Sequence, residues 1–440
     1  MVVHHRIKCP ASTTNTNTSE SVRVPSRCIY IRVDSTTTHS QKKRKIESPE
    51  PKDLSLAQQQ QKQQQQSTNT THPSTQPTFC SAFKTVKNNK SLYKSLTQQP
   101  ASDSDCFDEL SLLHFNGQSE RFPLAIPKAA DEFNPIQQLK AAVQHTIEFC
   151  VPLEKRSLFG DDIGGTKRKV VRAVNRKDPE AIKEAVLEYN QLLGSLDLNL
   201  HSVSSPAHPA LIAHVLDEAY AHTVAPDVDS LKNYKTFSNN VYGEVRHSLV
   251  SEFIERVKDR IIAQPGSPPP IFLDMGSGTG NVVLQVAAET QCEAHGIEIM
   301  ENPARLATLQ RQEFLARCNL YKIPVGSISL VKGDFLDDPS TTFLLPRADV
   351  IFVNNYAFDA HLNFRILERF LDLKEGAVVI SLKPFGSTII TEEDVARGVV
   401  RRGGENALEG MFVTREYWFG ENRVSWMAEG GKYYVHTLRR

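Results

Sequence analysis

The middle of the chain shows apolar residues recurring with the period of an α-helix. Stripes with spacings of three and four residues, which mark one face of a helix, occupy residues 136–147, 182–193, 211–219 and 245–261. The second stripe is preceded by Asp178 and Pro179, a capping carboxylate and a proline suited to the first helical position, and Gly194 closes it. We therefore expect a helical subdomain over residues 119–264.

Beyond this region the pattern changes to short apolar runs separated by helical stretches. A proline-rich linker, QPGSPPP, occupies residues 264–270 and forbids helix. Five runs of strand type begin near residues 271, 294, 328, 349 and 377, and helical stretches occupy 303–318 and 361–370. Alternating strands and helices predict an α/β domain with a parallel sheet over residues 265–440.

The first hundred residues have neither period. They contain a QQQQKQQQQ tract at 58–66 and hold 15 Lys and Arg against 5 Asp and Glu, whereas the rest of the chain holds 36 against 46. Few apolar residues are available to offset the entropy of ordering, so we expect residues 1–118 to be a disordered basic tail. Residues 42–45 are four consecutive cations, which fit a nuclear import signal, a phosphate contact or a solvated charge run.

A second basic stretch interrupts the acidic body. Residues 155–177 carry eight Lys and Arg against two Asp, which we interpret as a loop. Both a DNA-facing surface and an ordinary solvated face stay open for it.

Several classes of protein are excluded by composition. The sequence contains no run of 18 apolar residues, so no membrane span is predicted. No apolar segment of signal-peptide type opens the chain either. Seven scattered cysteines without CxxC pairs argue against a disulfide framework and a zinc site, and no metal is expected. A reducing compartment, cytosol or nucleus, fits best.

A glycine-rich turn follows the first strand and indicates the ligand. Asp274 precedes Gly276, Gly278 and Gly280 in the pattern (D/E)xGxGxG, which differs from the GxGxxG of dinucleotide sites. An acid at this place repels phosphate. It suits a ligand with ammonium and hydroxyl groups, namely S-adenosylmethionine (SAM).

Polar residues also end the next three strands. Glu298 stands where a carboxylate can accept the ribose hydroxyls, and Asp334 and Phe335 can bond and stack the adenine. The fourth strand ends in Asn354, Asn355 and Tyr356. Because ligands bind at the carboxyl ends of such strands, the ordered set predicts a SAM-dependent methyltransferase with a class I, Rossmann-like fold and a seven-stranded, mostly parallel sheet.

These motifs together resemble one family. The segments Tyr242-Gly243-Glu244, FLDMGSGTGN, GIEIM, GDF, VNNYAF and, near the end, VSW with GGKYY are similar to the disruptor-of-telomeric-silencing histone methyltransferases, of fungal type. The resemblance covers roughly residues 120–440. It implies transfer of one to three methyl groups from SAM to lysine-79 of histone H3 in nucleosomes, in the nucleus, with roles in chromatin regulation, telomeric silencing and the DNA-damage checkpoint.

The resemblance also implies roles for individual residues. Tyr242, Asn354 and Tyr356 would act at the reaction centre, and Trp426 and Thr437 would border the lysine channel. The implied cofactor contacts are Tyr242, Gly243, Glu244, Val245, Phe272, Leu273, Asp274, Met275, Gly276, Ser277, Gly278, Thr279, Gly280, Asn281, Glu298, Asp334, Phe335 and Asn354.

Partners and rival functions complete the expectation. The resemblance implies a monomer that contacts nucleosomal DNA through the basic tail and the 155–177 stretch, with ubiquitinated histone as a further partner.

Three of the site residues also have plain structural interpretations: Tyr242 as a helix-start contact, Asn354 as a cap and Trp426 as a core residue. An amino-methyltransferase acting on nucleic acid and a non-enzymatic nucleosome-binding module are the rival functions; the first lacks the two prolines of its (D/N)PP(Y/F) motif here.

Overall fold

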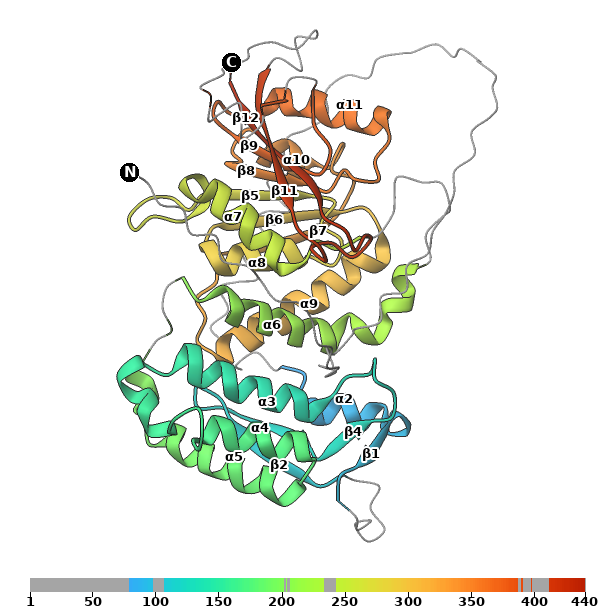
Figure 1. Ribbon diagram of the computed structural model, residues 1–440. Helices are drawn as coiled ribbons and strands as arrows, with labels where there is room; N and C mark the ends of the chain where they lie inside the picture. The colour runs from blue at the N-terminus through green and yellow to red at the C-terminus, as the bar shows by residue number, and fades with distance from the viewer. Residues whose placement is uncertain are drawn as a thin grey trace, which may run out of the picture.

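The computed structural model describes residues 79–97, 107–201, 203, 206–232, 243–386, 389–390, 397 and 411–439. Figure 1 shows an N-terminal lobe at one end of the molecule and a large sheet at the other. Helices α6 (Pro209–Thr223) and α9 (Glu301–Leu320) lie between the two.

The large sheet carries the chain from residue 271 onward. Its strands are β5 (Ile271–Met275), β6 (Glu293–Glu298), β7 (Ile328–Lys332), β8 (Val350–Val353), β9 (Val378–Ser381), β10 (Ile389–Ile390), β11 (Phe412–Phe419) and β12 (Gly431–Leu438). Their spatial order is β10-β11-β12-β9-β8-β5-β6-β7, and β12 alone runs antiparallel to both neighbours. This order, with one reversed strand near the edge, is that of the class I methyltransferase fold and confirms the predicted fold class. The described sheet has one strand more than the predicted seven, because the two-residue β10 pairs with Thr414 and Arg415.

Helices cover both faces of the sheet. One core contains α7 (His247–Ile261) and α8 (Asn281–Thr290), and the other contains α10 (Pro339–Leu344) and α11 (Ala360–Arg369). Strand β5 supplies both cores, because alternate side chains point to opposite faces: Phe272 enters the first, and Leu273 and Met275 enter the second. The strands nearest the middle of the sheet, β5, β8 and β9, are buried along their whole length.

The N-terminal lobe begins earlier than the sequence predicts. Its elements are α2 (Ala82–Asn88), η1 (Lys90–Leu92), β1 (Tyr93–Ser95), β2 (Glu109–Leu113), β3 (Ser119–Pro123), β4 (Ala125–Pro127), α3 (Pro135–His145), η2 (Thr146–Cys150), η3 (Leu153–Phe159), α4 (Thr166–Arg176) and α5 (Pro179–Gly194). The prediction of a disordered tail over residues 1–118 is therefore wrong for 79–97 and 107–118. Several of the few apolar residues there are buried, among them Val86, Tyr93, Leu112 and Phe115. Residues 1–78 and 98–106 lie outside the described residues.

The subdomain expected at 119–264 also differs from the structure. It contains strands β3 and β4 besides helices. Short helices η4 (Leu198–Leu200) and η5 (Ala225–Lys232) flank α6, and α6 and α7 pack on α8 and α9 of the sheet domain. The apolar stripes indicate helices correctly, but they do not show which neighbour each stripe covers.

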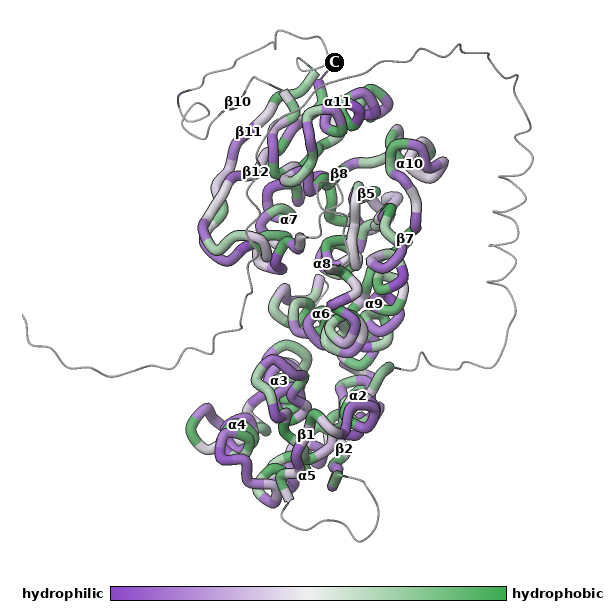
Figure 2. Tube along the Cα trace, turned by 90° about the vertical axis from the view of Figure 1, so that its right-hand side faces the viewer, coloured by the Kyte–Doolittle hydropathy of each residue, from purple (hydrophilic) through white to green (hydrophobic). Residues whose placement is uncertain are grey.

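The basic stretch 155–177 is mostly helix and not the predicted loop. Helix α4 turns Val170, Ala173 and Val174 into the core. It ends at Arg176, and the capping residue Lys177 has a left-handed φ of 55°. Its outer face is hydrophilic (Figure 2), so the cations lie in regular rows instead of on an irregular segment.

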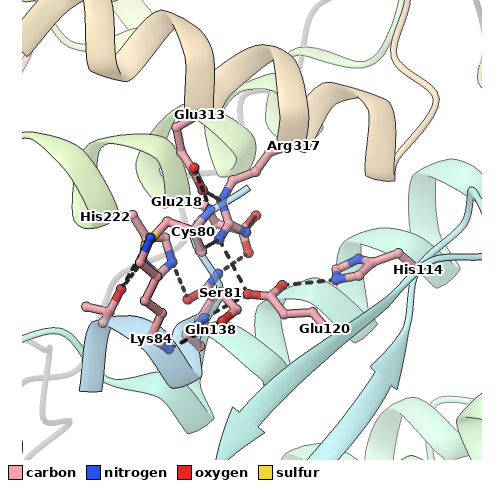
Figure 3. A network of polar contacts seen from close by, with 12 residues as sticks. Cys80, Ser81, Lys84, His114, Glu120, Gln138, Glu218, His222, Glu313 and Arg317 are labelled. Carbon is pink, nitrogen blue, oxygen red and sulfur yellow. Dashed lines mark hydrogen bonds and ion pairs between the residues drawn. The ribbon is translucent and has the colours of Figure 1, made fainter. Parts of the chain in front are cut away.

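A buried ionic network joins the lobe to the sheet domain (Figure 3). Arg317 of α9 is fully buried and donates to Glu313 at 2.7 Å, to Glu218 of α6 at 3.0 Å and to the carbonyl oxygen of Cys80 at 2.8 Å. Glu120 of β3 lies 3.4 Å from the same guanidinium. One cation thus holds four separate segments of the chain together.

Candidate active site

A glycine turn at the end of β5 forms the floor of the site. Gly276, Gly278 and Gly280 have φ values of 97°, 56° and 88°, in the left-handed region that other residues rarely adopt. The amides of Gly276 and Ser277 donate to the carbonyl oxygen of Ile297 at 2.9 and 3.1 Å. The turn is therefore fixed against β6, and its backbone faces open space.

A cavity of about 280 Å³ opens above this turn. Its lining includes most of the predicted cofactor contacts: Gly243, Glu244, Val245, Asp274, Gly276, Ser277, Gly278, Thr279, Asn281, Glu298, Asp334, Phe335 and Asn354. The structure thus brings together residues from the upstream segment, the glycine turn and the ends of three strands.

Asp274 is the most unusual group in the cavity. It is 1% exposed, and its Oδ1 atom has no hydrogen-bond partner. Burial, together with the nearby carboxylate of Glu298, raises the pKa of Asp274 well above its ordinary value. A buried acceptor without a donor is costly, so the site is suited to a ligand that brings a positive charge or hydrogen-bond donors.

Glu298 and Asp334 are held by backbone amides. The two carboxylate oxygens of Glu298 accept from Gly278 at 2.9 Å and from Met300 at 2.7 Å. Burial nevertheless raises the pKa of Glu298. Asp334 accepts from the amide of Leu336 at 2.9 Å. Each carboxylate oxygen has two lone pairs, so both side chains are oriented and can still accept from a ligand.

The far end of the cavity is built by the segment that precedes α7. Residues 423–425 pair with it: Val424 bridges Val245, and Glu244 and Ser425 exchange two hydrogen bonds of 2.8 and 2.9 Å. Asn354 donates from Nδ2 to the carbonyl oxygen of Gly243 at 3.2 Å. Three segments far apart in sequence therefore meet at this end.

Two aromatic rings border that end. Trp426 packs so closely on Gly243 that an added Cβ would lie 2.6 Å from its Cε3 atom. The ring of Tyr356 lies 5.3 Å from that of Trp426 and is 45% exposed. Neither residue lines the cavity itself; they form an aromatic wall beside it. Tyr242, predicted to act here, lies outside the described residues.

Five predicted site residues are placed away from the cavity. Phe272, Leu273 and Met275 pack in the two cores, and Gly280 faces Leu330 and Ala307. Thr437 pairs with Val378, the first residue of β9. The prediction of Thr437 as a channel residue is wrong, because β12 is reversed and ends at the opposite edge of the sheet.

Some lining residues were missed by the sequence reasoning. Ile299, Met300 and Pro303 lie within five residues after Glu298, and Leu336 follows Phe335. Proximity to the polar strand ends was the available signal for these.

Asn355 has a structural role that no local pattern indicates. It is fully buried and accepts from the amides of Leu382 and Lys383, so it braces β8 against β9.

Neither a metal-binding cluster nor a membrane-spanning helix is found in the part of the chain that the structure describes. No group of three or more His, Cys, Asp and Glu side chains is arranged there to hold a metal ion. No helix in the same ranges combines the length and apolar character needed to cross a membrane.

The strand order, the glycine turn and the acid-lined cavity define a protein of the class I methyltransferase fold. Residues 220–438 match the family model described as histone methylation protein DOT1. This part of the chain belongs to the DOT1 family.

Relatives from several fungi are similar to the chain. It is 35% identical over 325 residues to a histone-lysine N-methyltransferase, H3 lysine-79 specific, of Emericella nidulans, covering 72% of this chain and 62% of the relative. A Yarrowia lipolytica protein of the same description is 34% identical, with 73% and 64% covered. The chain therefore spans about three fifths of the length of these curated relatives. A solved putative class I SAM-dependent methyltransferase from Listeria monocytogenes is 14% identical, with 69% and 88% covered and a TM-score of only 0.34.

Proposed function

We propose that this chain transfers methyl groups from SAM to lysine-79 of histone H3 within nucleosomes, in the nucleus. The observation that carries the proposal is the buried, unpaired carboxylate of Asp274 in a cavity lined by the family's motif residues. The two relatives described above carry this activity in their names. Roles in telomeric silencing and the DNA-damage checkpoint, and a response to ubiquitinated histone, belong to the same proposal.

The residues of the cavity fit SAM, which would supply an electrophilic methyl group on a sulfonium. Asp274, with its free Oδ1, would receive donors or positive charge from the ligand. Glu298 would accept from the ribose, and Asp334 and Phe335 would hold the adenine. Gly276 lets the backbone approach without a side chain in the way.

The acceptor end fits a lysine side chain. Asn354 is fixed by its bond to Gly243, and Trp426 and Tyr356 form the aromatic wall. A lysine amine with an ordinary pKa of about 10.4 must lose its proton before it attacks. A desolvating aromatic wall next to the sulfonium of bound SAM would lower that pKa, so the chain's task would be alignment, with no dedicated general base.

Nucleosomal DNA is the proposed contact of helix α4. Arg168, Arg172 and Arg176 follow one another at intervals of four, which puts them on one face of the helix, and all three are exposed. Within the described ranges none of the three forms an ion pair, whereas Lys167 and Lys169 are paired with Asp162 and Glu188. Unmatched cations in a row suit a phosphate backbone. Four basic residues of the predicted tail, Lys84, Lys87, Lys90 and Lys94, lie in the described N-terminal lobe, and those of residues 1–78 lie outside the described residues.

The test is mass spectrometry of recombinant nucleosomes incubated with the chain and SAM. Methylation of H3 lysine-79 is the expected result, and its absence with active SAM binding would refute the acceptor assignment. A Gly276→Arg variant is the control for the donor site, because φ is 97° there and a side chain would be strained; it should abolish both SAM binding and turnover. Methylation of naked DNA instead of histone would favour a nucleic-acid enzyme.

A further inference from the structure

An exposed tryptophan lies at the carboxyl end of β11. Trp418 is 68% exposed, although Tyr417 and Phe419 on either side of it are buried in the core. The fold therefore uses the neighbours of Trp418 for packing and leaves the largest ring in solvent. Exposed tryptophans of this kind are enriched at protein contacts, where they dominate the binding energy.

The direction of β11 places Trp418 on the same edge as the cavity. Strands β9 and β11 both run antiparallel to β12, so they are parallel to each other. The carboxyl end of β11 thus lies with the carboxyl ends of β8 and β9, where Asn354 and Tyr356 are found. The turn after Trp418 leads within eight residues to Trp426, which closes on Gly243 (β11 and β12 in Figure 1).

The surroundings of Trp418 are electrically balanced. Lys432, its partner across the strands, lies with Nζ 4.6 Å from the centre of the indole ring. The same ammonium is 2.8 Å from the carboxylate of Glu416, which lies on the same strand face as Trp418. A polyanion binds through unmatched cations, and Lys432 is already matched. This neighbourhood therefore suits a protein surface better than DNA.

We infer that Trp418, oriented by Lys432 and Glu416, is a docking anchor for the folded surface of the histone substrate around the acceptor lysine. The inference rests on the proposed function and adds a contact outside the cavity. The tryptophan acts on substrate capture and touches neither the donor nor the reacting atoms.

The experiment compares Trp418→Ser with two matched variants. Trp418→Phe keeps an aromatic ring at the same place. Phe343→Ser removes a similar exposed pair, since Phe343 is 57% exposed with Arg347 at 4.6 Å over its ring. Phe343 lies near the end of α10, which leads into the amino end of β8, at the opposite edge of the sheet. Each variant is assayed for KM and kcat on intact nucleosomes, SAM affinity, and affinity for the same DNA without histones.

For Trp418→Ser we expect a rise in the nucleosome KM of at least about tenfold, with unchanged SAM affinity and DNA affinity. Trp418→Phe should recover most of the loss, and Phe343→Ser should behave like the parent chain. A KM within twofold of the parent, an equal effect of Phe343→Ser, or a parallel loss of DNA affinity would overturn the inference. Nucleosome affinity measured without SAM separates the two proposals: a parent chain that binds through Trp418 but methylates nothing would refute the proposed function alone.

Discussion

Replacing Arg317 by alanine tests whether the network in Figure 3 holds the lobe on the sheet domain. The guanidinium is fully buried and donates to Glu313, Glu218 and the Cys80 carbonyl oxygen. The change leaves buried carboxylates without their shared cation. Breaking a buried ion pair by removing one partner costs about 3–5 kcal/mol. For a chain of this size that lowers Tm by roughly 3–7 °C, which thermal unfolding followed by circular dichroism measures.

The pH dependence of this loss is a second readout. Burial by itself would raise the pKa of Glu120, but Arg317 and His114 outweigh it and lower that pKa from 4.5 to about 2. A carboxyl group with a depressed folded pKa adds stability above its unfolded pKa, and this is lost as the pH falls through the folded value. The destabilisation by Arg317→Ala should therefore shrink between about pH 4.5 and pH 2.

Arg121→Ala is the matched control for this experiment. Arg121 is also paired with a glutamate, Glu109, but the two side chains are 57% and 36% exposed. Exposed pairs of this kind contribute about 0–1 kcal/mol. If Arg317→Ala lowered Tm no more than Arg121→Ala does, the network would not join the two parts of the molecule in the way argued above.

Three further changes test the site and the core. Asp274→Asn should weaken SAM binding at least about tenfold, since a charged hydrogen bond is lost, without lowering the Tm of the ligand-free chain; calorimetric titration showing unchanged affinity would contradict this. Gly243→Ala should lower kcat/KM on nucleosomes at least about tenfold by moving Trp426, whereas Gly420→Ala, with no atom within 4 Å of the new Cβ, should match the parent. Burial lowers the pKa of His436 from 6.5 to about 3, so the unfolded chain takes up a proton first as the pH falls. The parent should lose up to about 1.4 kcal/mol per pH unit relative to His436→Gln below about pH 6.5, and urea unfolding that shows a constant difference would refute the assignment.

The donor side of the site could be predicted from the sequence because its residues are local. Asp274 and the glycines of the turn are separated by fixed short intervals, and Glu298 and Asp334 each end a recognisable strand. In a parallel sheet, residues that end successive strands meet at one edge without further information. This reasoning failed where side chains along β5 alternate between the two faces of the sheet. Phe272 has the right position in the motif but points into a core.

The Arg317 network and the misplaced Thr437 show why other features could not be predicted. The contacts of Arg317 to Glu218 and Cys80 join residues 99 and 237 positions apart, and no local pattern encodes such a distance. Thr437 follows a run that looks like any other strand. Thr437 lies at the edge of the sheet away from the cavity only because β12 runs in the reversed direction, which is a property of the assembled sheet.

The two ends of the cavity therefore differ in how they depend on the rest of the fold. The donor end is a continuous turn with the ends of β6 and β7, and it needs only the pairing of β5, β6 and β7. The acceptor end needs Gly243, Asn354 and Trp426 at once, and the last of these follows β11 in a hairpin that joins the central strands through the pairing of β12 with β9. A change that loosens β12 should thus impair methyl transfer before it impairs SAM binding. Acceptor specificity is in this sense a property of the wider tertiary structure, whereas donor binding depends mainly on the glycine turn and the two strand ends beside it.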